Sequence, residues 1–210
     1  MASIGWLVIG TNRYRDLAIR CLSTIRANYN GALSPRYLLF TDQPKACSHD
    51  WVEHEQFPGI SLQRYRHFHR HASRLASCTY LFYVDADMEF VEVGDELLGK
   101  RLVVQHPAFV NTPAVDCPFD RNPACRASIP SEHQGPYFQN CFQGGESAEF
   151  LRMSRRLARR IRADLRRGVM PLWHDESHMN RYMVEHPPPG CSIPATPSLS
   201  GGPAFAFPVG

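Results

Sequence analysis

The sequence predicts an α/β fold built on one mostly parallel sheet. Apolar runs of strand length, at residues 3–9, 37–41, 79–84 and 102–105, alternate with segments of helical periodicity. Such alternation is typical of a parallel sheet covered by helices. The 210 residues, 43% of them hydrophobic, are enough for a single domain with a sizeable core. In sheets of this kind, ligands bind beyond the carboxyl ends of the strands.

The first half of the chain supplies most of the predicted strands. Residues 3–9 are rich in Ile, Leu and Val, which predicts a buried strand that ends in a turn at residues 10–12. A helix is expected over residues 14–29, because Leu17, Cys21 and Ile25 recur on one side. Buried strands at 37–41 and 79–84, a weak strand near 51–57 and a polar helix over 63–77 complete this half.

The second half is dominated by two predicted helices. The clearer one covers residues 146–167, where Phe150, Met153, Leu157 and Ile161 form an apolar stripe and Gly168 supplies a stop. The other covers residues 175–185. A short strand at 102–105, a proline-rich loop over 109–136 and a strand over 137–143 precede them. We expect one domain over residues 1–190 and a mobile tail, rich in Pro and Gly, over 191–210.

Composition argues for a cytoplasmic protein. The seven cysteines are odd in number and none has CxxC spacing, so free thiols in a reducing compartment are expected. No apolar run approaches the roughly 20 residues that span a bilayer, and the N-terminus lacks a signal peptide. The formal net charge is +3, but eight arginines fall between residues 152 and 167.

Two carboxylates, Asp85 and Asp87, directly follow the apolar run at 79–84. Two negative charges at a strand end suit a divalent cation, since manganese and magnesium prefer hard oxygen ligands. Such an ion would bridge to a diphosphate and neutralise its charge as it leaves. A solvated turn or a helix N-cap would explain the same residues without any ligand.

The segment WHDESH at residues 173–178 is dense in chemical groups. A zinc site similar to H-E-x-x-H fits poorly, because the glutamate does not follow the first histidine. A sugar pocket fits better, since carboxylates accept hydrogen bonds from hydroxyls and one can stabilise an oxocarbenium-like centre. A polar helix start capped by Asp175 is the third reading.

Basic residues form two further clusters. The arginines at 152–167 suit anionic lipid headgroups, which attract arginine near a membrane surface, or else form a solvated helix face. Nucleic-acid binding is not expected, because no aromatic residues interleave with these charges. His67, His69 and His71 lack carboxylates nearby in the sequence, so a solvated or phosphate-adjacent surface is a better interpretation than a metal site.

The chain resembles glycosyltransferase family 6, the family of the blood-group A and B transferases and the α-1,3-galactosyltransferases. The resemblance rests on FTDQP at 40–44, VDADMEF at 84–90, FDRNP at 119–123 and WHDESH at 173–178, in this order. It implies a GT-A fold and retaining α-1,3 transfer of galactose or N-acetylgalactosamine from a UDP-sugar to a β-galactoside, fucosylated or not. The short length and the absent anchor resemble the bacterial members.

The resemblance also implies roles for individual residues. It places the uridine pocket at Ile9, Gly10, Thr11 and Tyr14, and the metal at Asp85 and Asp87. Because both aspartates are retained, manganese dependence is predicted. Further donor contacts are implied for Tyr65, Val84, Ala86, Gln139, Asn140, Cys141, His174 and Asp175, and for either Arg70 or Arg74 beside the diphosphate. His106, Trp173, Glu176 and His178 match acceptor contacts.

Glu176 matches the proposed catalytic carboxylate of the family. It would either form a covalent glycosyl-enzyme or stabilise an ion pair during front-face attack. Donor choice stays open, although the intermediate volume of Cys141 favours galactose slightly. The implied partners are UDP-galactose or UDP-N-acetylgalactosamine, a glycan acceptor carried on a lipid, and an anionic inner-membrane surface. The alternative function is a glycan-binding module without turnover.

Overall fold

The computed structural model describes residues 1–43, 49–188 and 192–194. These residues form a seven-stranded sheet in the order β3-β2-β1-β4-β6-β5-β7. All neighbouring strands pair in parallel except β6, which is antiparallel to both β4 and β5. The predicted α/β fold with a mostly parallel sheet is therefore confirmed, and the arrangement agrees with a GT-A-like fold.

The strands of the first half lie side by side on one side of the sheet, from β3 at its edge to β4 at its centre. Their bounds are Ser3–Ile9 for β1, Ser34–Thr41 for β2, His49–Trp51 for β3 and Tyr80–Val84 for β4. The expected strand near residues 51–57 is confined to β3, since the chain beyond Trp51 runs as a loop. Residues of that loop line one wall of a cleft at the carboxyl ends of β1 and β4.

The remaining strands lie at the other edge. They are β5 (Leu102–Gln105), β6 (Phe138–Glu146) and β7 (Ser192–Pro194). β6 continues through Gly144, where the sequence had predicted its end. A Cβ at this residue would lie 2.2 Å from a ring atom of Phe82. The bare backbone lets β6 pair closely with β4. The predicted tail falls on β7 and otherwise lies outside the described residues.

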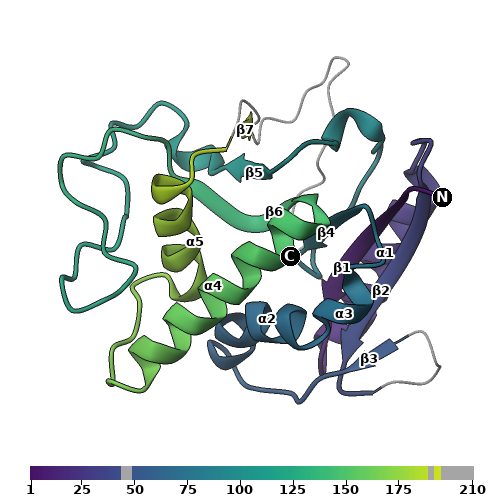
Figure 1. Ribbon diagram of the computed structural model, residues 1–210, viewed down its shortest axis with the longest axis horizontal. Coiled ribbons are helices and arrows are strands. Elements are labelled where there is room, and N and C mark those ends of the chain that lie inside the picture. The colour runs from purple at the N-terminus through teal and green to yellow at the C-terminus, as the bar shows by residue number, and fades with distance from the viewer. Residues whose placement is uncertain (44–48, 189–191, 195–210) are drawn as a thin grey trace.

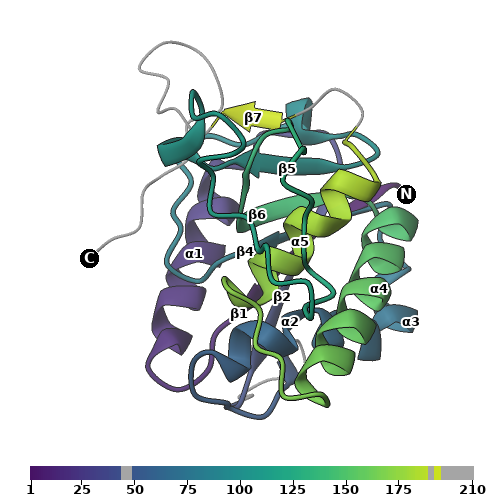
Figure 2. The same cartoon turned by 90° about the vertical axis from the view of Figure 1, so that its left-hand side faces the viewer.

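Helices cover both faces of the sheet, as Figures 1 and 2 show. The bounds are Tyr14–Asn28 for α1, Gly59–Arg70 for α2, Ala72–Leu75 for α3, Ser147–Leu165 for α4 and His174–Glu185 for α5. α1 lies on one face, whereas α2, α4 and α5 lie on the other. The predicted helix over 63–77 is divided at His71, and it begins earlier than expected, at Gly59. Short 3₁₀ turns occur at Asp95–Leu97 and Pro107–Phe109.

Each face has its own apolar core. Trp6 stacks on Phe82 and Phe142 beneath α1, with ring centroids 5.4 and 6.4 Å apart. On the other face, the α4 stripe of Phe150, Met153, Leu157 and Ile161 is buried, as the sequence predicted. Burying a side chain of this size stabilises the fold by about 1.5–3 kcal/mol. These two cores hold the carboxyl ends of β1 and β4 side by side.

None of the helices in the described ranges combines the length and the apolar composition needed to cross a bilayer. The five described cysteines, Cys21, Cys78, Cys117, Cys125 and Cys141, are free and buried.

Candidate active site

A cleft of about 240 Å³ lies where β1 and β4 end. Sequence reasoning had placed ligand contacts at this position, because neighbouring parallel strands present their carboxyl ends on the same edge. Six predicted residues line the cleft: Ile9, Thr11, Tyr14, Asp85, Ala86 and Asp87. Further lining comes from residues that were not predicted, among them His54 and Phe57 of the loop before α2 and Arg64 of α2.

Gly10 positions the first wall of the cleft. A Cβ at Gly10 would lie 2.3 Å from Cβ of Ala18, so only glycine lets α1 approach the end of β1 this closely. The following residues then reach the cleft: Thr11 Oγ1 lies 2.9 Å from His54 Nδ1, and the Tyr14 side chain is exposed. Gly10 therefore acts through packing, whereas Thr11 and Tyr14 face the space where a ligand would lie.

Two residues with left-handed backbone flank the cleft. Asn12, with φ 50°, donates its N–H to the carboxylate of Asp42 at 3.1 Å, and His174 has φ 51°. The His174 ring packs edge-on against Phe57, with centroids 4.9 Å apart, so it supports a residue of the cleft wall without lining the cleft itself. Non-glycine residues held in this region cluster at ligand sites, where the surrounding structure imposes the conformation.

Asp85 and Asp87 are partly exposed at the cleft, and hydrogen bonds from neighbouring residues hold only Asp85 in place. Oδ1 of Asp85 accepts a hydrogen bond from the Tyr83 hydroxyl at 2.5 Å, and its backbone N–H donates to the Cys141 carbonyl at 2.8 Å. Within the described residues, Asp87 makes no hydrogen bond or ion pair. The pair thus presents oxygen atoms to the cleft that no protein donor occupies.

A divalent cation fits this pair by its donor chemistry. Carboxylate oxygens suit magnesium and manganese, which take one or two carboxylates and complete their shell with substrate phosphates and water. No third acidic, histidine or cysteine side chain of the described structure joins Asp85 and Asp87 in a metal-sized group. Any cation held there would therefore need oxygen atoms from a ligand.

Arg64 joins the cleft to the buried carboxylates behind it. Its Nη2 lies 3.1 Å from Asp85 Oδ1, and its Nε lies 3.1 Å from Asp175 Oδ2. Nη1 donates to the Asn140 carbonyl at 2.8 Å, and the guanidinium stacks over the Tyr83 ring at 4.4 Å. Sequence reasoning missed Arg64, although it had placed the next residue, Tyr65, among the donor contacts.

Asn140 organises the acidic pair of α5. Its side-chain Nδ2 donates to Asp175 Oδ2 at 2.6 Å, and its backbone N–H donates to Glu176 Oε2 at 3.0 Å. The second oxygen of Glu176 accepts a hydrogen bond from the Tyr137 hydroxyl at 2.6 Å. Tyr65, fully buried behind the cleft, donates to Asn140 Oδ1 at 2.8 Å. The Glu176 carboxylate is therefore held in one orientation by two donors.

Burial raises the pKa values of all three network carboxylates. It raises the pKa of Asp175 to about 7, against the opposing charge of Arg64. It also raises the pKa of Glu176, which the hydrogen bonds from Tyr137 and Asn140 oppose. The pKa of Asp85 is raised by burial too, while Arg64 opposes the shift and Asp87 adds to it. Shifted acids gathered beside a cleft are typical of functional sites.

Two predicted acceptor residues, His106 and Trp173, are absent from the lining of the cleft. His106 packs against Tyr137, with ring centroids 5.8 Å apart, and Tyr137 contacts Glu176. Trp173 is exposed, and its backbone N–H donates to Ser177 Oγ at 2.8 Å. Gln139 precedes Asn140 on β6 and is partly exposed, while Cys141 is buried beside Asp85.

Four further predicted site residues lie away from the cleft. Arg70 is exposed on another face of α2, and Arg74 pairs with Asp50. His178 is fully buried, with Nε2 3.4 Å from Asp164 Oδ2. Burial lowers the His178 pKa to about 4, so the ring is neutral at pH 7. Val84 is also fully buried, and its side chain belongs to the core beneath α1.

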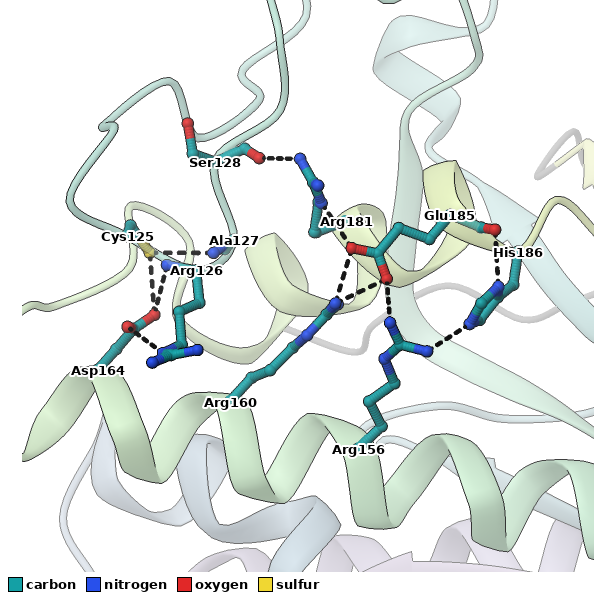
Figure 3. Close-up of polar contacts among 10 residues, drawn as sticks. All are labelled: Cys125, Arg126, Ala127, Ser128, Arg156, Arg160, Asp164, Arg181, Glu185 and His186. Atoms are coloured by element: carbon teal, nitrogen blue, oxygen red, sulfur yellow. Dashed lines mark hydrogen bonds and ion pairs between the residues drawn. The ribbon is translucent and has the colours of Figure 1, made fainter.

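A second group with metal-ligand chemistry surrounds His178. Cys125, Asp164 and His178 hold their ligand atoms within 4.8 Å of one another, and all three are buried. Oδ2 of Asp164 already accepts the Arg126 N–H at 2.8 Å and lies 3.4 Å from Cys125 Sγ (Figure 3). By contrast, His67, His69 and His71 form no such group. His67 is buried rather than on the surface, where the sequence had suggested it would lie.

Several known transferases are similar in sequence to this chain. The chain is 25% identical over 201 residues to globoside α-1,3-N-acetylgalactosaminyltransferase 1 of Gallus gallus, covering 89% of this chain and 59% of that protein. It is 31% identical over 130 residues to histo-blood group ABO system transferase 2 of Rattus norvegicus, covering 61% and 36%. It is 26% identical over 167 residues to the O-antigen biosynthesis glycosyltransferase WbnI of Escherichia coli, covering 73% and 70%.

The share of each relative that the chain covers limits which of its properties can be transferred to this chain. The chain spans about six tenths of the chicken protein and little more than a third of the rat protein. The model of glycosyltransferase family 6 matches residues 50–195, which is more than half of this chain and includes Asp85, Asp87 and Glu176. This chain belongs to glycosyltransferase family 6.

Proposed function

We propose that the protein is a retaining hexosyltransferase that moves galactose or N-acetylgalactosamine from a UDP-sugar, in α-1,3 linkage, to a β-galactoside, fucosylated or not. One observation carries the proposal: a single network of ion pairs and hydrogen bonds runs from Asp85 in the cleft through Arg64, Asp175 and Asn140 to Glu176. Family membership supports the reaction class. The relatives are named for α-1,3 transfer of N-acetylgalactosamine and for blood-group transfer.

The donor would bind along the cleft. Tyr14 offers an exposed ring for the uracil base, and Ile9 and Thr11 form the wall beside it. The diphosphate would lie toward Asp85 and Asp87, whose free oxygens are the ligands a manganese ion prefers. When bound, that ion would neutralise charge on the departing UDP. Arg64, which already pairs with Asp85, would keep the first carboxylate ionised and oriented.

Glu176 would act on the sugar. A retaining transfer builds positive charge at the anomeric carbon, which a carboxylate on the opposite face of the ring stabilises. Tyr137 and the Asn140 backbone hold Glu176 with both oxygens engaged, so its position is set before any ligand arrives. His106, packed against Tyr137, and the exposed Trp173 would then meet the acceptor glycan.

Donor choice would be made next to Asn140. Cys141 is buried and its carbonyl binds the Asp85 N–H, so its side-chain volume borders the strand end that carries the aspartates. A thiol is larger than the hydrogen or methyl that would leave room for an N-acetyl group, which favours galactose. One donor screen decides this: release of UDP is measured from UDP-galactose and UDP-N-acetylgalactosamine, with manganese and with EDTA.

The same screen tests the function itself. The proposal predicts UDP release that requires manganese and rises when a β-galactoside is added. A glycan-binding module without turnover predicts that neither donor is consumed under any condition. Wild-type rates that EDTA leaves unchanged would contradict the metal role of Asp85 and Asp87 while leaving the transfer reaction standing.

A further inference from the structure

The eight arginines at residues 152–167 divide into two sets. In the first set, each guanidinium pairs with an acid: Arg152 with Glu149, Arg156 and Arg160 with Glu185, and Arg167 with Asp164. Figure 3 shows Arg156 and Arg160 of α4 pointing toward Glu185 of α5, where Arg181 joins them. Each guanidinium of this set therefore has an acidic partner within the protein, contrary to a uniformly basic helix face.

The second set has no such partners. Arg155, Arg159, Arg162 and Arg166 are exposed, and none of them pairs with an acidic side chain in the described ranges. Their spacing of four, three and four residues places them on one face of α4, where neighbouring positive charges repel each other. An anionic ligand would gain the most electrostatic stabilisation at such a row of arginines, because no acidic side chain offsets their charge.

Three members of the second set face α2 across a groove of about 720 Å³. We name this the arginine groove. Its cationic lining consists of Arg159, Arg162 and Arg166 from α4 with Arg66, His69 and Arg70 from α2. Every one of these side chains is exposed, and no acidic side chain lines the groove. Arg70, which the sequence analysis had considered for the donor site, thus belongs here.

The floor of the arginine groove is apolar. Leu62 of α2 and Ile161 of α4 are buried beneath it, and Ala158 and Leu165 are partly buried. A basic rim above an apolar floor suits an amphiphilic anion better than a fully hydrated one. No Phe, Tyr or Trp lines the groove, so it lacks the stacking surface by which proteins hold single-stranded nucleic acid.

We propose that the arginine groove docks the protein on an anionic phospholipid bilayer by binding lipid phosphate groups. Guanidinium groups form paired hydrogen bonds to phosphate, and five of them along one groove exceed what a single phosphate would use. The arginine groove shares no lining residue with the donor cleft, although α2 contributes to both. Docking would therefore leave the cleft open, and the inference stands independently of the proposed function.

Vesicle sedimentation tests this inference. The groove variant Arg159→Gln/Arg162→Gln is compared with Arg20→Gln/Arg26→Gln on α1, which changes the net charge equally on the opposite face of the sheet. Wild type should sediment with vesicles containing phosphatidylglycerol, but not with pure phosphatidylcholine, and high salt should release it. The groove variant should bind about 30-fold more weakly. The α1 variant should bind as wild type does.

Two controls keep the result interpretable. Thermal melts of the groove variant should match the wild type, since neither groove arginine makes an ion pair in the described structure. The α1 variant should melt only slightly lower, because it removes the partly exposed ion pair of Arg20 with Glu89, and such pairs contribute little to stability. UDP release from a soluble donor should also be unchanged. Equal loss of binding in both variants, or a wild type that ignores phosphatidylglycerol, would overturn the proposal. So would groove-dependent binding of single-stranded RNA without vesicle binding.

Discussion

Arg64 and Asp175 form an ion pair inside the protein, with Nε of the arginine 3.1 Å from Oδ2 of the aspartate. Both side chains are buried, and they come from helices far apart in the sequence, α2 and α5. The same guanidinium also reaches Asp85 at the cleft. The pair thus links the acidic strand end to the segment that carries Glu176.

Arg64→Gln should destabilise the protein by about 3–5 kcal/mol, because it leaves Asp175 buried without its cation. Urea unfolding followed by circular dichroism measures this. Arg70→Gln, on the same helix but exposed, is the matched control and should change stability little. Equal stability of the two variants would contradict the bridging role of Arg64.

Asp175→Asn should change how stability depends on pH. An unfolded aspartate titrates near pH 4, whereas the folded pKa of Asp175 is about 7, so the folded protein holds a proton in between that the unfolded chain has lost. The stability that this proton contributes is therefore highest at acid pH and falls as pH rises toward 7. The difference in unfolding free energy, wild type minus variant, should fall by up to about 1.4 kcal/mol per pH unit. A flat or rising difference would show that burial does not govern this group.

Much of the site could be predicted from the sequence because its signals are local. Asp85 and Asp87 follow an apolar run that had to be a buried strand, so the carboxylates had to emerge at its end. The stripe that predicted α4 is equally local. Arg64 could not be found in this way, because its role depends on how α2 packs against β6 and α5. The division of the α4 arginines into paired and unpaired sets likewise depends on Glu185, which another helix supplies.

Asp87→Asn should weaken manganese-dependent binding of UDP by at least about tenfold. Losing an outer-shell partner already weakens a metal site by about tenfold or more, and Asp87 would be a direct ligand. Asp87 is the better test of the pair, because within the described structure it has no ion-pair partner whose loss would disturb the fold. Isothermal titration with UDP, with and without manganese, measures the effect. In EDTA, wild type and variant should bind UDP alike. A defect that persists in EDTA would argue against a metal role.

His178→Gln should act on stability rather than on substrate binding. The ring is fully buried beside Asp164, so a differently shaped side chain there should lower the free energy of unfolding by about 1–3 kcal/mol. At a temperature where the variant is folded, its KM for a β-galactoside should match the wild type. A raised KM at unchanged stability would instead support the acceptor contact that the resemblance implied.

The most direct test of the account is the turnover of Glu176→Gln. The variant keeps the shape of the side chain: its amide oxygen can accept the Asn140 N–H, and its amide nitrogen can donate to the Tyr137 hydroxyl oxygen. Because only the negative charge beneath the sugar is lost, kcat for transfer from the preferred UDP-sugar should fall by at least about 10²-fold, while the Kd for UDP with manganese stays near the wild-type value. Turnover close to wild type, at normal UDP affinity, would contradict the account.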